Sequence, residues 1–357
     1  MQNGLAHFAV GGLSRWDAGK VLAFCAFPVI PLLAPIGYYA GVPWLSPLIV
    51  LVAIPLLDAV LPGDRSGETS GKFTAVAGLL QAIPLVYVLT WASTLIWALR
   101  LLAGVALPPD TTIWLIVSTG IGSAFATCAA HEMLHWPEPL PRAAARLIMA
   151  TVAYGPFPIE HVHHHDAVGI RAQGTTPPLG QGLWAYLATN VRHTFTSAWH
   201  IERECQVRMR RSVLRNRIIQ QLFLTALAVI AFVFVAGLLG LALFVVQAVF
   251  GIYTTEYVNY AQHYGLSRDS SGSVTGTVSW SSNRFATNVA TLNITRHADH
   301  HLNGALRYYE LRPLTGMPTL PAGYLGLFFP AMVPAVWRAL MDERARQVSR
   351  VHAQKAS

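Results

Sequence analysis

Charged side chains are scarce in this sequence: Asp, Glu, Lys and Arg together make up 12% of its 357 residues. Hydrophobic residues make up 53%, and the mean hydropathy is +0.43. A soluble domain of this length carries a more highly charged surface, so the composition excludes an ordinary soluble protein. Long apolar runs alternate with short basic stretches, which is typical of a protein that crosses a membrane several times.

Cysteine is also rare. Cys25, Cys128 and Cys205 lie far apart and form no CxxC pair, which excludes a rubredoxin-type, zinc-ribbon or iron–sulfur site built from the thiolates of this chain. The N-terminus lacks the basic region and cleavage site of a secretory signal, so we expect the first apolar run to be kept as a span. The net charge of +8 does not point to a nucleic-acid partner. Membrane proteins gather Lys and Arg on their cytoplasmic side, which accounts for the excess of basic residues.

Six apolar segments are each close to the roughly 20 residues that a helix needs to cross a bilayer. They are 20–40, 44–61, 77–98, 111–130, 218–237 and 240–259. The last two are divided between Gly237 and Gly240, because glycines favour a tight turn between helices. The sequence therefore predicts an all-α, polytopic membrane protein with six transmembrane helices, in a single domain of residues 1–357.

The basic residues set the orientation of these spans. With the N-terminus in the cytoplasm, Arg100 is the single basic residue of the outer loops, as the positive-inside rule requires. Segments 131–217 and 260–357 are then cytoplasmic and form a histidine-rich helical cap, and both termini are cytoplasmic. Segment 323–341 is apolar but contains Pro330, Pro334 and Arg338, so we expect a helix on or dipping into the membrane and not a seventh span.

Histidine is abundant, and ten of the fourteen histidines fall into four clusters on the predicted cytoplasmic side. The clusters are His131 and His135; His161, His163, His164 and His165; His263; and His297, His300 and His301. Lys and Arg alone set the topology, so the shared side independently supports one common site. The isolated histidines are expected to be packing or surface residues; they are His7, His193, His200 and His352.

Helical spacing selects nine of these ten imidazoles. The first cluster has an i, i+4 pair, and the second and fourth each contain an i, i+3, i+4 set, so each set lies on one helical face. His163 points away from the face that the other histidines of its cluster share. Neutral imidazole suits iron, zinc or copper. Nine such ligands are too many for one ion but suffice for two, with an open position on each.

Several carboxylates are candidates for roles beside such ions. Glu132, Glu160, Asp166 and Asp299 are close enough in sequence to bridge the ions or to hold the outer N–H groups of the imidazoles. Asp58 lies near the cytoplasmic end of the second span, where an ionisable residue is either functional or caps a helix end at the interface.

The second span and a basic segment raise two further hypotheses. Ile54 and Val50 lie one and two turns deeper than Asp58, and their modest size would leave room for an alkyl chain if this span lines a channel. The basic segment either contacts anionic lipid or docks an acidic electron carrier. Its arginines are Arg203, Arg208, Arg210, Arg211, Arg215 and Arg217.

Four ordered motifs carry a family resemblance: HEMLHW, EHVHHHDAVG, VNYAQHYGL and NITRHADHHLN. They resemble the histidine boxes of the membrane-bound alkane 1-monooxygenases, within the integral-membrane hydroxylase and desaturase superfamily that also includes the xylene monooxygenases. The segments AIPLLD, ALRYYELRP, PTLPAGY and VPAVWRALMDERA extend the likeness over most of the chain from about residue 45 onward. The second box departs from the HxxxHH spacing of the alkane enzymes, and Gln262 stands where the family has a glutamate.

The resemblance implies a six-helix enzyme of the bacterial inner membrane with a non-haem di-iron centre on the cytoplasmic side. Such enzymes insert one oxygen atom of O2 into a terminal C–H bond of an alkane or alkyl chain, giving an alcohol. Rubredoxin or ferredoxin, with an NAD(P)H-dependent reductase, supplies the electrons. The implied iron ligands are His131, His135, His161, His164, His165, His263, His297, His300 and His301, with Glu132, Glu160, Asp299 and Asp58 as candidate catalytic carboxylates.

Other functions are compatible with parts of the sequence. A fatty-acyl hydroxylase or desaturase, or an alkylaromatic monooxygenase, would use the same boxes. An intramembrane zinc protease would use HEMLH with Glu132 as general base, but it needs only about three protein ligands and leaves the other clusters unexplained. A metal transporter would place its site near the bilayer midplane rather than at one face.

Overall fold

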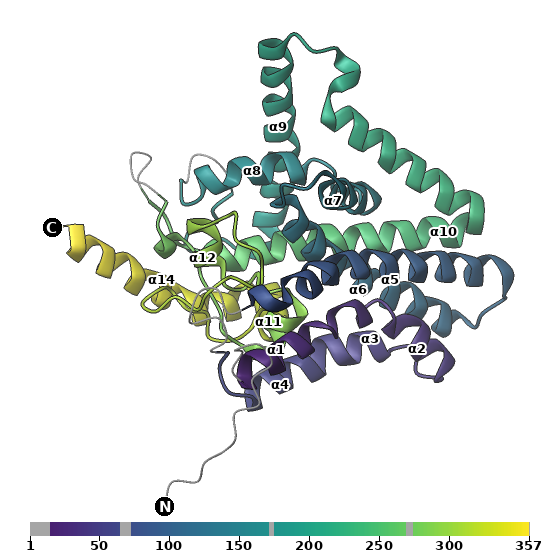
Figure 1. Ribbon diagram of the computed structural model, residues 1–357, viewed down its shortest axis with the longest axis horizontal. Coiled ribbons are helices and arrows are strands. Elements are labelled where there is room, and N and C mark those ends of the chain that lie inside the picture. The colour runs from purple at the N-terminus through teal and green to yellow at the C-terminus, as the bar shows by residue number, and fades with distance from the viewer. Residues whose placement is uncertain (1–14, 65–72, 171–174, 269–273, 357) are drawn as a thin grey trace, which may run out of the picture.

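The computed structural model describes residues 15–64, 73–170, 175–268 and 274–356. In these segments the chain forms helices and loops, and the sole strand-like pairing is an isolated bridge between Ser281 and Thr319. The predicted all-α class is therefore confirmed over the described part of the chain (Figure 1). His7 lies outside the described residues.

The helices follow the order of the predicted segments. The N-terminal half contains α1 (Arg15–Phe24), α2 (Leu33–Tyr39), α3 (Leu45–Leu48), a π-helical turn (Ile49–Ala53), α4 (Ile54–Val60), α5 (Ala77–Gly104), α6 (Pro109–Leu134), α7 (Pro139–Thr151) and α8 (Phe157–Ala167). The C-terminal half contains α9 (Leu183–Met209), α10 (Arg217–His263), α11 (Phe285–Ala290), α12 (His297–Leu302), α13 (Tyr324–Met332) and α14 (Pro334–Ala356).

Three of these helices, α5, α6 and α10, are long and apolar enough to cross a membrane. A fourth crossing results if the helices Trp16–Val29 and Leu33–Tyr39, which are bent by 66°, count as one broken span. The predicted second span appears as a shorter apolar helix, Leu45–Val60, which contains the π-helical turn. The chain is therefore a membrane protein, and six remains the number that hydropathy predicts.

The fifth and sixth predicted spans form the two legs of α10. Helical geometry breaks at Ala236 (φ −131°, ψ 18°) and Gly237 (φ 56°, ψ −134°), next to the predicted division. Gly237 has the positive φ that glycine adopts without strain. A Cβ at Gly240 would overlap the carbonyl oxygen of Phe232, so the second glycine lets the legs approach closely. Figure 1 shows that the legs run in different directions from this bend.

Helix α6 lies at the centre of the bundle. Of its apolar window 83% is buried, against 44% for α5 and 22% for α10, so α6 packs on protein while much of α10 is left for lipid. Small residues allow this packing, since close helix contact in membranes depends on them. A Cβ at Gly120 would lie 2.7 Å from the ring of Phe250, and one at Gly122 would lie 3.2 Å from Pro31.

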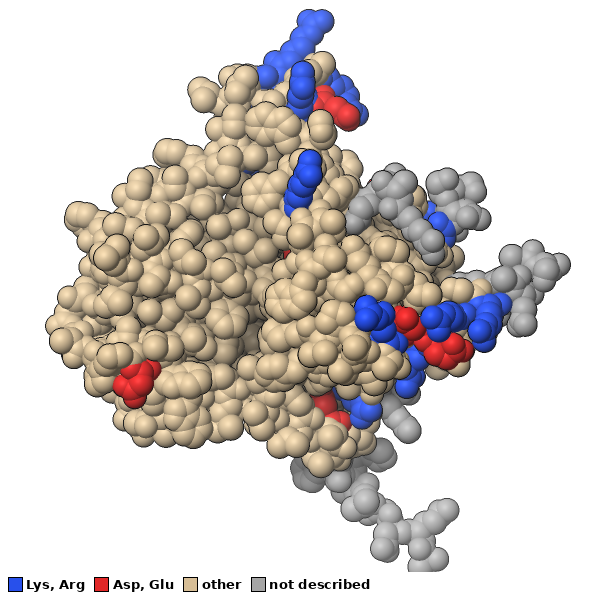
Figure 2. Space-filling model, turned by 180° about the vertical axis from the view of Figure 1, so that it is seen from behind, with Lys and Arg blue, Asp and Glu red and all other residues tan. Residues whose placement is uncertain are grey.

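Charge is concentrated at one end of the molecule and at one projecting tip. Figure 2 shows most of the visible charged residues there, with a single acidic patch at the opposite end, while most of the visible surface carries uncharged residues. The apolar 323–341 segment consists of two helices, α13 and α14, that meet at Val333 instead of forming one straight span. Helices α8 and α12 lie close to the end of the second leg of α10 (Figure 1), where the histidines meet.

Candidate metal centre

Eight of the predicted ligands form two compact groups at the ends of helices. The first group is His131, His135, His161 and His300, and the second is His164, His263, His297 and His301. Within each group the candidate ligand atoms all lie within 4.8 Å of one another. Within the described part of the chain, every member of both groups is a histidine.

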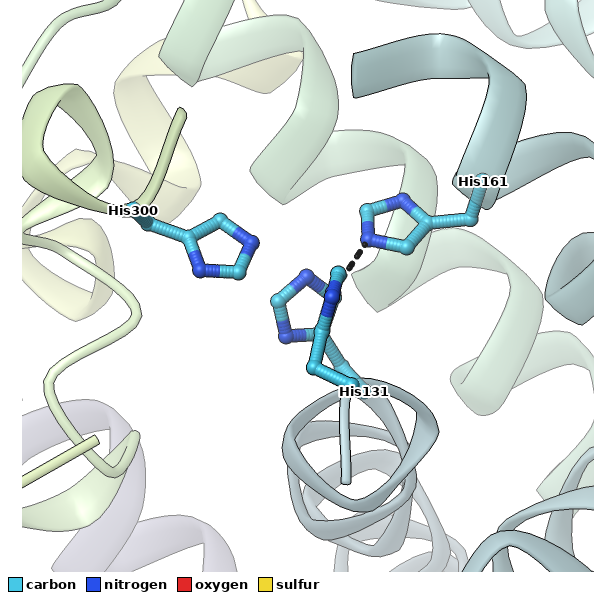
Figure 3. A group of neighbouring side chains, drawn as sticks. His131, His161 and His300 are labelled. Atoms are coloured by element: carbon cyan, nitrogen blue, oxygen red, sulfur yellow. Dashed lines mark hydrogen bonds between the residues drawn. The ribbon is translucent and has the colours of Figure 1, made fainter. Parts of the chain in front are cut away.

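Helix geometry explains how the boxes divide between the groups. Helix α6 supplies His131 and His135 at its C-terminal end, and α10 supplies His263 as its last residue. Helices α8 and α12 contribute to both groups. Helix α8 sends His161 to the first and His164 to the second, and α12 sends His300 to the first and His297 with His301 to the second. In Figure 3, His131, His161 and His300 converge from three separate elements.

The ring nitrogens face one another at the spacing expected around a cation. In the second group, the Nε2 atom of His263 lies 3.3 Å from that of His164 and 3.1 Å from that of His297. In the first, the Nε2 atoms of His135 and His161 are 3.1 Å apart. Metal–nitrogen bonds of about 2.0–2.1 Å at right angles give nitrogen separations of about 3 Å. The buried Nε2 atom of His300 has no hydrogen-bond partner among the described residues, so this donor set fits bound metal ions.

His165 lies between the two groups and belongs to neither set of four. Its Nε2 atom is 3.2 Å from that of His161. Its ring centroid is 4.7 Å from that of His300 and 4.6 Å from that of His301. His163, by contrast, is exposed on the outer side of α8. The helical phase of this box therefore turns His165 toward the other imidazoles and His163 away from them, and ligation by His165 stays a prediction.

Burial keeps these imidazoles in the form that binds metal. Desolvation, with a contribution from neighbouring imidazoles, lowers the pKa of five of them well below the usual value: His161, His164, His297, His300 and His301. The same causes lower the pKa of His165 to about 3. The rings are therefore neutral near neutral pH, as metal ligation requires.

Two of the predicted carboxylates hold the helices that carry the histidines. Glu132 accepts hydrogen bonds from the indole of Trp136 at 2.8 Å and the backbone N–H of Tyr308 at 3.0 Å. Asp299 forms a bidentate ion pair with Arg312 and accepts a hydrogen bond from Asn303. Neither carboxylate belongs to a metal group. Both anchor residues beside ligands, which orients the imidazoles.

Glu160 is buried near a second carboxylate, Glu256, which no sequence motif marked. Burial and the adjacent Glu256 raise the pKa of Glu160 to about 8. Glu256 accepts hydrogen bonds from Tyr154 and, at 2.5 Å, from Asn190. An ionisable residue inside a predicted span was the available signal for Glu256. Asp166, the remaining candidate, is exposed.

Asp58 contacts a different part of the molecule. Its carboxylate accepts hydrogen bonds from the backbone N–H groups of Ala286 at 2.8 Å and Thr287 at 3.1 Å, and from the Thr287 hydroxyl. It therefore caps the N-terminus of α11, where an acceptor satisfies free N–H groups. Of the two roles open for Asp58, these contacts favour the structural one.

A buried ionic network, also not marked by any motif, supports the fourth box. Arg296, directly before His297, pairs with Asp64 at 3.0 Å, and Lys20 pairs with the same carboxylate. Although burial acts to raise it, Lys20 and Arg296 lower the pKa of Asp64 to about 2. Lys20 also donates a hydrogen bond to Asn293 at 2.7 Å. Sequence spacing gave no signal for this network, because Asp64 lies 44 residues from Lys20 and 232 residues from Arg296.

Two neighbouring cavities, which share three lining residues, lie on one side of the histidines. A small one of about 30 Å³ lies against His131, His161, His164 and His297. A larger one of about 290 Å³ is lined almost wholly by apolar side chains from α3, the π-helical turn, α6, α10 and α13. Val50 lines the larger cavity, whereas Ile54 is not part of its wall. The structure therefore supports the predicted channel at Val50 alone.

Gln262 lies in the wall of the small cavity. Its amide nitrogen donates hydrogen bonds to the hydroxyl of Tyr324 at 2.9 Å and to the backbone carbonyl of Ile294 at 3.2 Å. An ionised carboxylate cannot donate to the Ile294 carbonyl, so this arrangement requires the amide.

Comparison with known families agrees with this site. Residues 110–331 match the family model described as fatty acid desaturase. This match covers more than half of the chain and spans all four histidine boxes, and the chain belongs to that family.

Individual relatives indicate which class of enzyme the chain belongs to within this family. The chain is 32% identical to alkane 1-monooxygenase 2 of Pseudomonas aeruginosa, over 85% of this chain and 84% of that protein. It is 30% identical to alkane 1-monooxygenase 1 of the same organism, over 92% and 91% of the two chains. The hydroxylase component of a xylene/toluene monooxygenase of Pseudomonas putida is 29% identical, over 90% and 87%. The chain is therefore an oxidoreductase of the oxygen-dependent hydroxylase type.

Proposed function

We propose that this chain is a non-haem di-iron monooxygenase that hydroxylates the terminal carbon of an alkane or alkyl chain. The observation that carries the proposal is the convergence of two imidazole groups on a small cavity that shares part of its wall with a larger apolar cavity. One oxygen atom of O2 enters the C–H bond to give an alcohol. The other leaves as water, with two electrons and two protons supplied from outside the substrate.

The nine predicted histidines would hold two iron ions. The first group with His165 offers five imidazoles and the second offers four. Bound iron supplies the oxidising power that a strong C–H bond demands, which no side chain provides. Glu132 and Asp299 keep the ligand-bearing helices in place through the contacts described above. Glu160 lies one residue before His161 and is proposed to act beside the ligands. We assign Asp58 a structural role at α11.

The remaining residues around the site bind the substrate and exclude water. The apolar wall of the larger cavity favours a hydrocarbon and disfavours bulk water. Because the wall includes the partly exposed Trp114, a substrate dissolved in the membrane can enter without crossing water. The chain itself lacks a second redox centre made of cysteine thiolates, so an external carrier must deliver electrons.

We further propose a place in the cell and electron partners for the enzyme. The bacterial relatives favour the inner membrane, and the basic residues favour an orientation with both termini and the metal centre at the cytoplasmic side. There, rubredoxin or ferredoxin and an NAD(P)H-dependent reductase can reach the histidine-bearing end of the protein.

Two related reactions have specific support. The family description favours desaturation of a fatty-acyl chain, and the Pseudomonas putida relative favours an alkylaromatic substrate. The zinc-protease alternative fits poorly, because Glu132 is held by Trp136 and Tyr308 instead of facing an open ligand position.

The test is turnover by the purified protein in lipid nanodiscs with NADH, reductase and either carrier. Alkanes, fatty-acyl chains and alkylaromatics are supplied in turn under 18O2, and products are identified by mass spectrometry. We expect about two irons per chain and a terminal alcohol that contains one 18O atom. An unsaturated product would show desaturation instead, and an iron-loaded protein that oxidises none of these substrates would overturn the proposal.

A further inference from the structure

The small cavity beside the histidines and the larger apolar cavity share part of their walls. Both are lined by Cys128 of α6 and by Thr254 and Val258 of α10. Cys128 lies one helical turn before His131. Thr254 and Val258 are four residues apart and therefore share one face of α10. These three side chains, which we name the neck, separate the apolar cavity from the space beside the histidines.

The two sides of the neck differ greatly in size. The histidine side holds about 30 Å³, and one water-sized group needs roughly 10–15 Å³ of such volume. About two small groups therefore fit beside the histidines, such as a methyl end and one oxygen species. The apolar side holds about 290 Å³. The body of a substrate chain must lie there.

The apolar cavity is long and follows α6. Its α6 wall contains Trp114, Val117, Ile121, Phe125 and Cys128, which recur at helical spacing. At about 1.5 Å per residue this row extends for about 20 Å and ends at the neck. An unbranched chain laid along α6 would therefore point one end at the histidines.

We propose that Cys128, Thr254 and Val258 determine which carbon is oxidised, because the neck admits the end of an unbranched chain and excludes its middle. This inference rests on the proposed hydroxylase function and adds specificity residues to it. The three act by positioning the substrate, so widening the neck should change the position of oxidation more than the overall rate.

The experiment compares Cys128→Ala, Val258→Ala and their combination with wild type in the nanodisc assay, using an n-alkane and a chain branched near its end. The ratio of terminal to subterminal alcohol is measured by gas chromatography. We expect the subterminal fraction to rise at least about fivefold in the double variant, with gain of activity on the branched chain. Val117→Ala is the control for Val258→Ala, because it removes the same two methyl groups from the apolar cavity but away from the neck. It should leave the ratio of terminal to subterminal alcohol unchanged.

Two results would overturn the inference. One is an unchanged ratio in an iron-loaded double variant that still turns over, and the other is an equal shift caused by Val117→Ala. If the double variant loses its iron, Thr254→Ser widens the neck by one methyl group and is judged by the same ratio. Failure of the wild type to oxidise any chain would instead contradict the hydroxylase function, and the neck inference would fall with it.

Discussion

His163 and His164 are adjacent in the sequence but lie in opposite environments. His163 is exposed, whereas His164 is 2% exposed. The Nε2 atom of His164 lies 3.3 Å from the Nε2 atom of His263. We expect His164→Ala to remove one iron and to lower activity by more than the roughly 10–100-fold that loss of a residue holding a metal ligand costs. His163→Ala should keep both irons. Metal analysis of the two purified variants is the measurement, and loss of iron from His163→Ala alone would reverse the assignment.

Val50 and Ile54 make a matched pair for testing the channel. Val50 lines the apolar cavity and is 2% exposed, while Ile54 lies outside its wall. Val50→Trp fills part of the cavity, so the longest alkane oxidised should become shorter by several carbons while short chains still react. Ile54→Trp should leave the chain-length profile unchanged. The profile is measured with a mixed series of n-alkanes. A profile shortened equally by both substitutions would contradict the cavity as the substrate site.

At the scale of single residues, the histidines were predictable and their partners were not. The i, i+3, i+4 spacing of the boxes is a local property of an α-helix, so it assigned the facing imidazoles and excluded His163 without any tertiary information. The contacts of Glu132 with Tyr308 and of Asp58 with Thr287 join segments over 170 residues apart. Sequence position alone could mark these carboxylates as unusual but could not give their partners.

At the scale of elements, α11 depends on a cap supplied from another helix. Asp58→Ala removes the acceptor for Ala286 and Thr287 and should lower the free energy of unfolding by about 1–2 kcal/mol. Asp58→Asn keeps an acceptor oxygen and should lose less. Thermal unfolding in detergent, with iron content as a second readout, measures the effect. Normal stability with abolished turnover in Asp58→Ala would instead identify a catalytic carboxylate.

Hydropathy predicted the positions of the helices better than their bends and local geometry. The long spans α5 and α6 coincide with apolar windows, and the glycines at the bend of α10 gave its position. The 66° bend between the first two helices and the π-helical turn were not predictable. Both depend on which neighbours pack against the helix, and an apolar window carries no information about those neighbours.

At the scale of the whole molecule, the basic segment forms a tip that projects away from the histidines. Figure 1 shows α9 and the start of α10 meeting there, far from α12. Between its arginines the tip exposes Val207 (76%) and Leu214 (78%). A mixture of cations and exposed apolar side chains suits the surface of an anionic bilayer. The position of the tip therefore favours lipid contact over carrier docking.

Neutralising this tip separates the two roles. Replacing Arg208, Arg210 and Arg211 by Gln should reduce the anionic lipid that co-purifies with the protein, because each arginine near the surface contributes about 1 kcal/mol. The KM for rubredoxin or ferredoxin, measured at several salt concentrations, should stay within about twofold of wild type. A KM that rises several-fold and loses its salt dependence would show that the carrier docks at the tip.

The π-helical turn at Ile49–Ala53 also limits which sequence changes this region can accept during evolution. A π turn holds one residue more than an α turn between the same two ends, so the residues on either side are offset by one position. Deleting a single residue here would restore an α-helix and rotate Val50 by about 100° relative to Asp58. The cavity wall and the α11 cap could then no longer both keep their contacts. Single-residue insertions and deletions in this turn should thus be tolerated less well than substitutions.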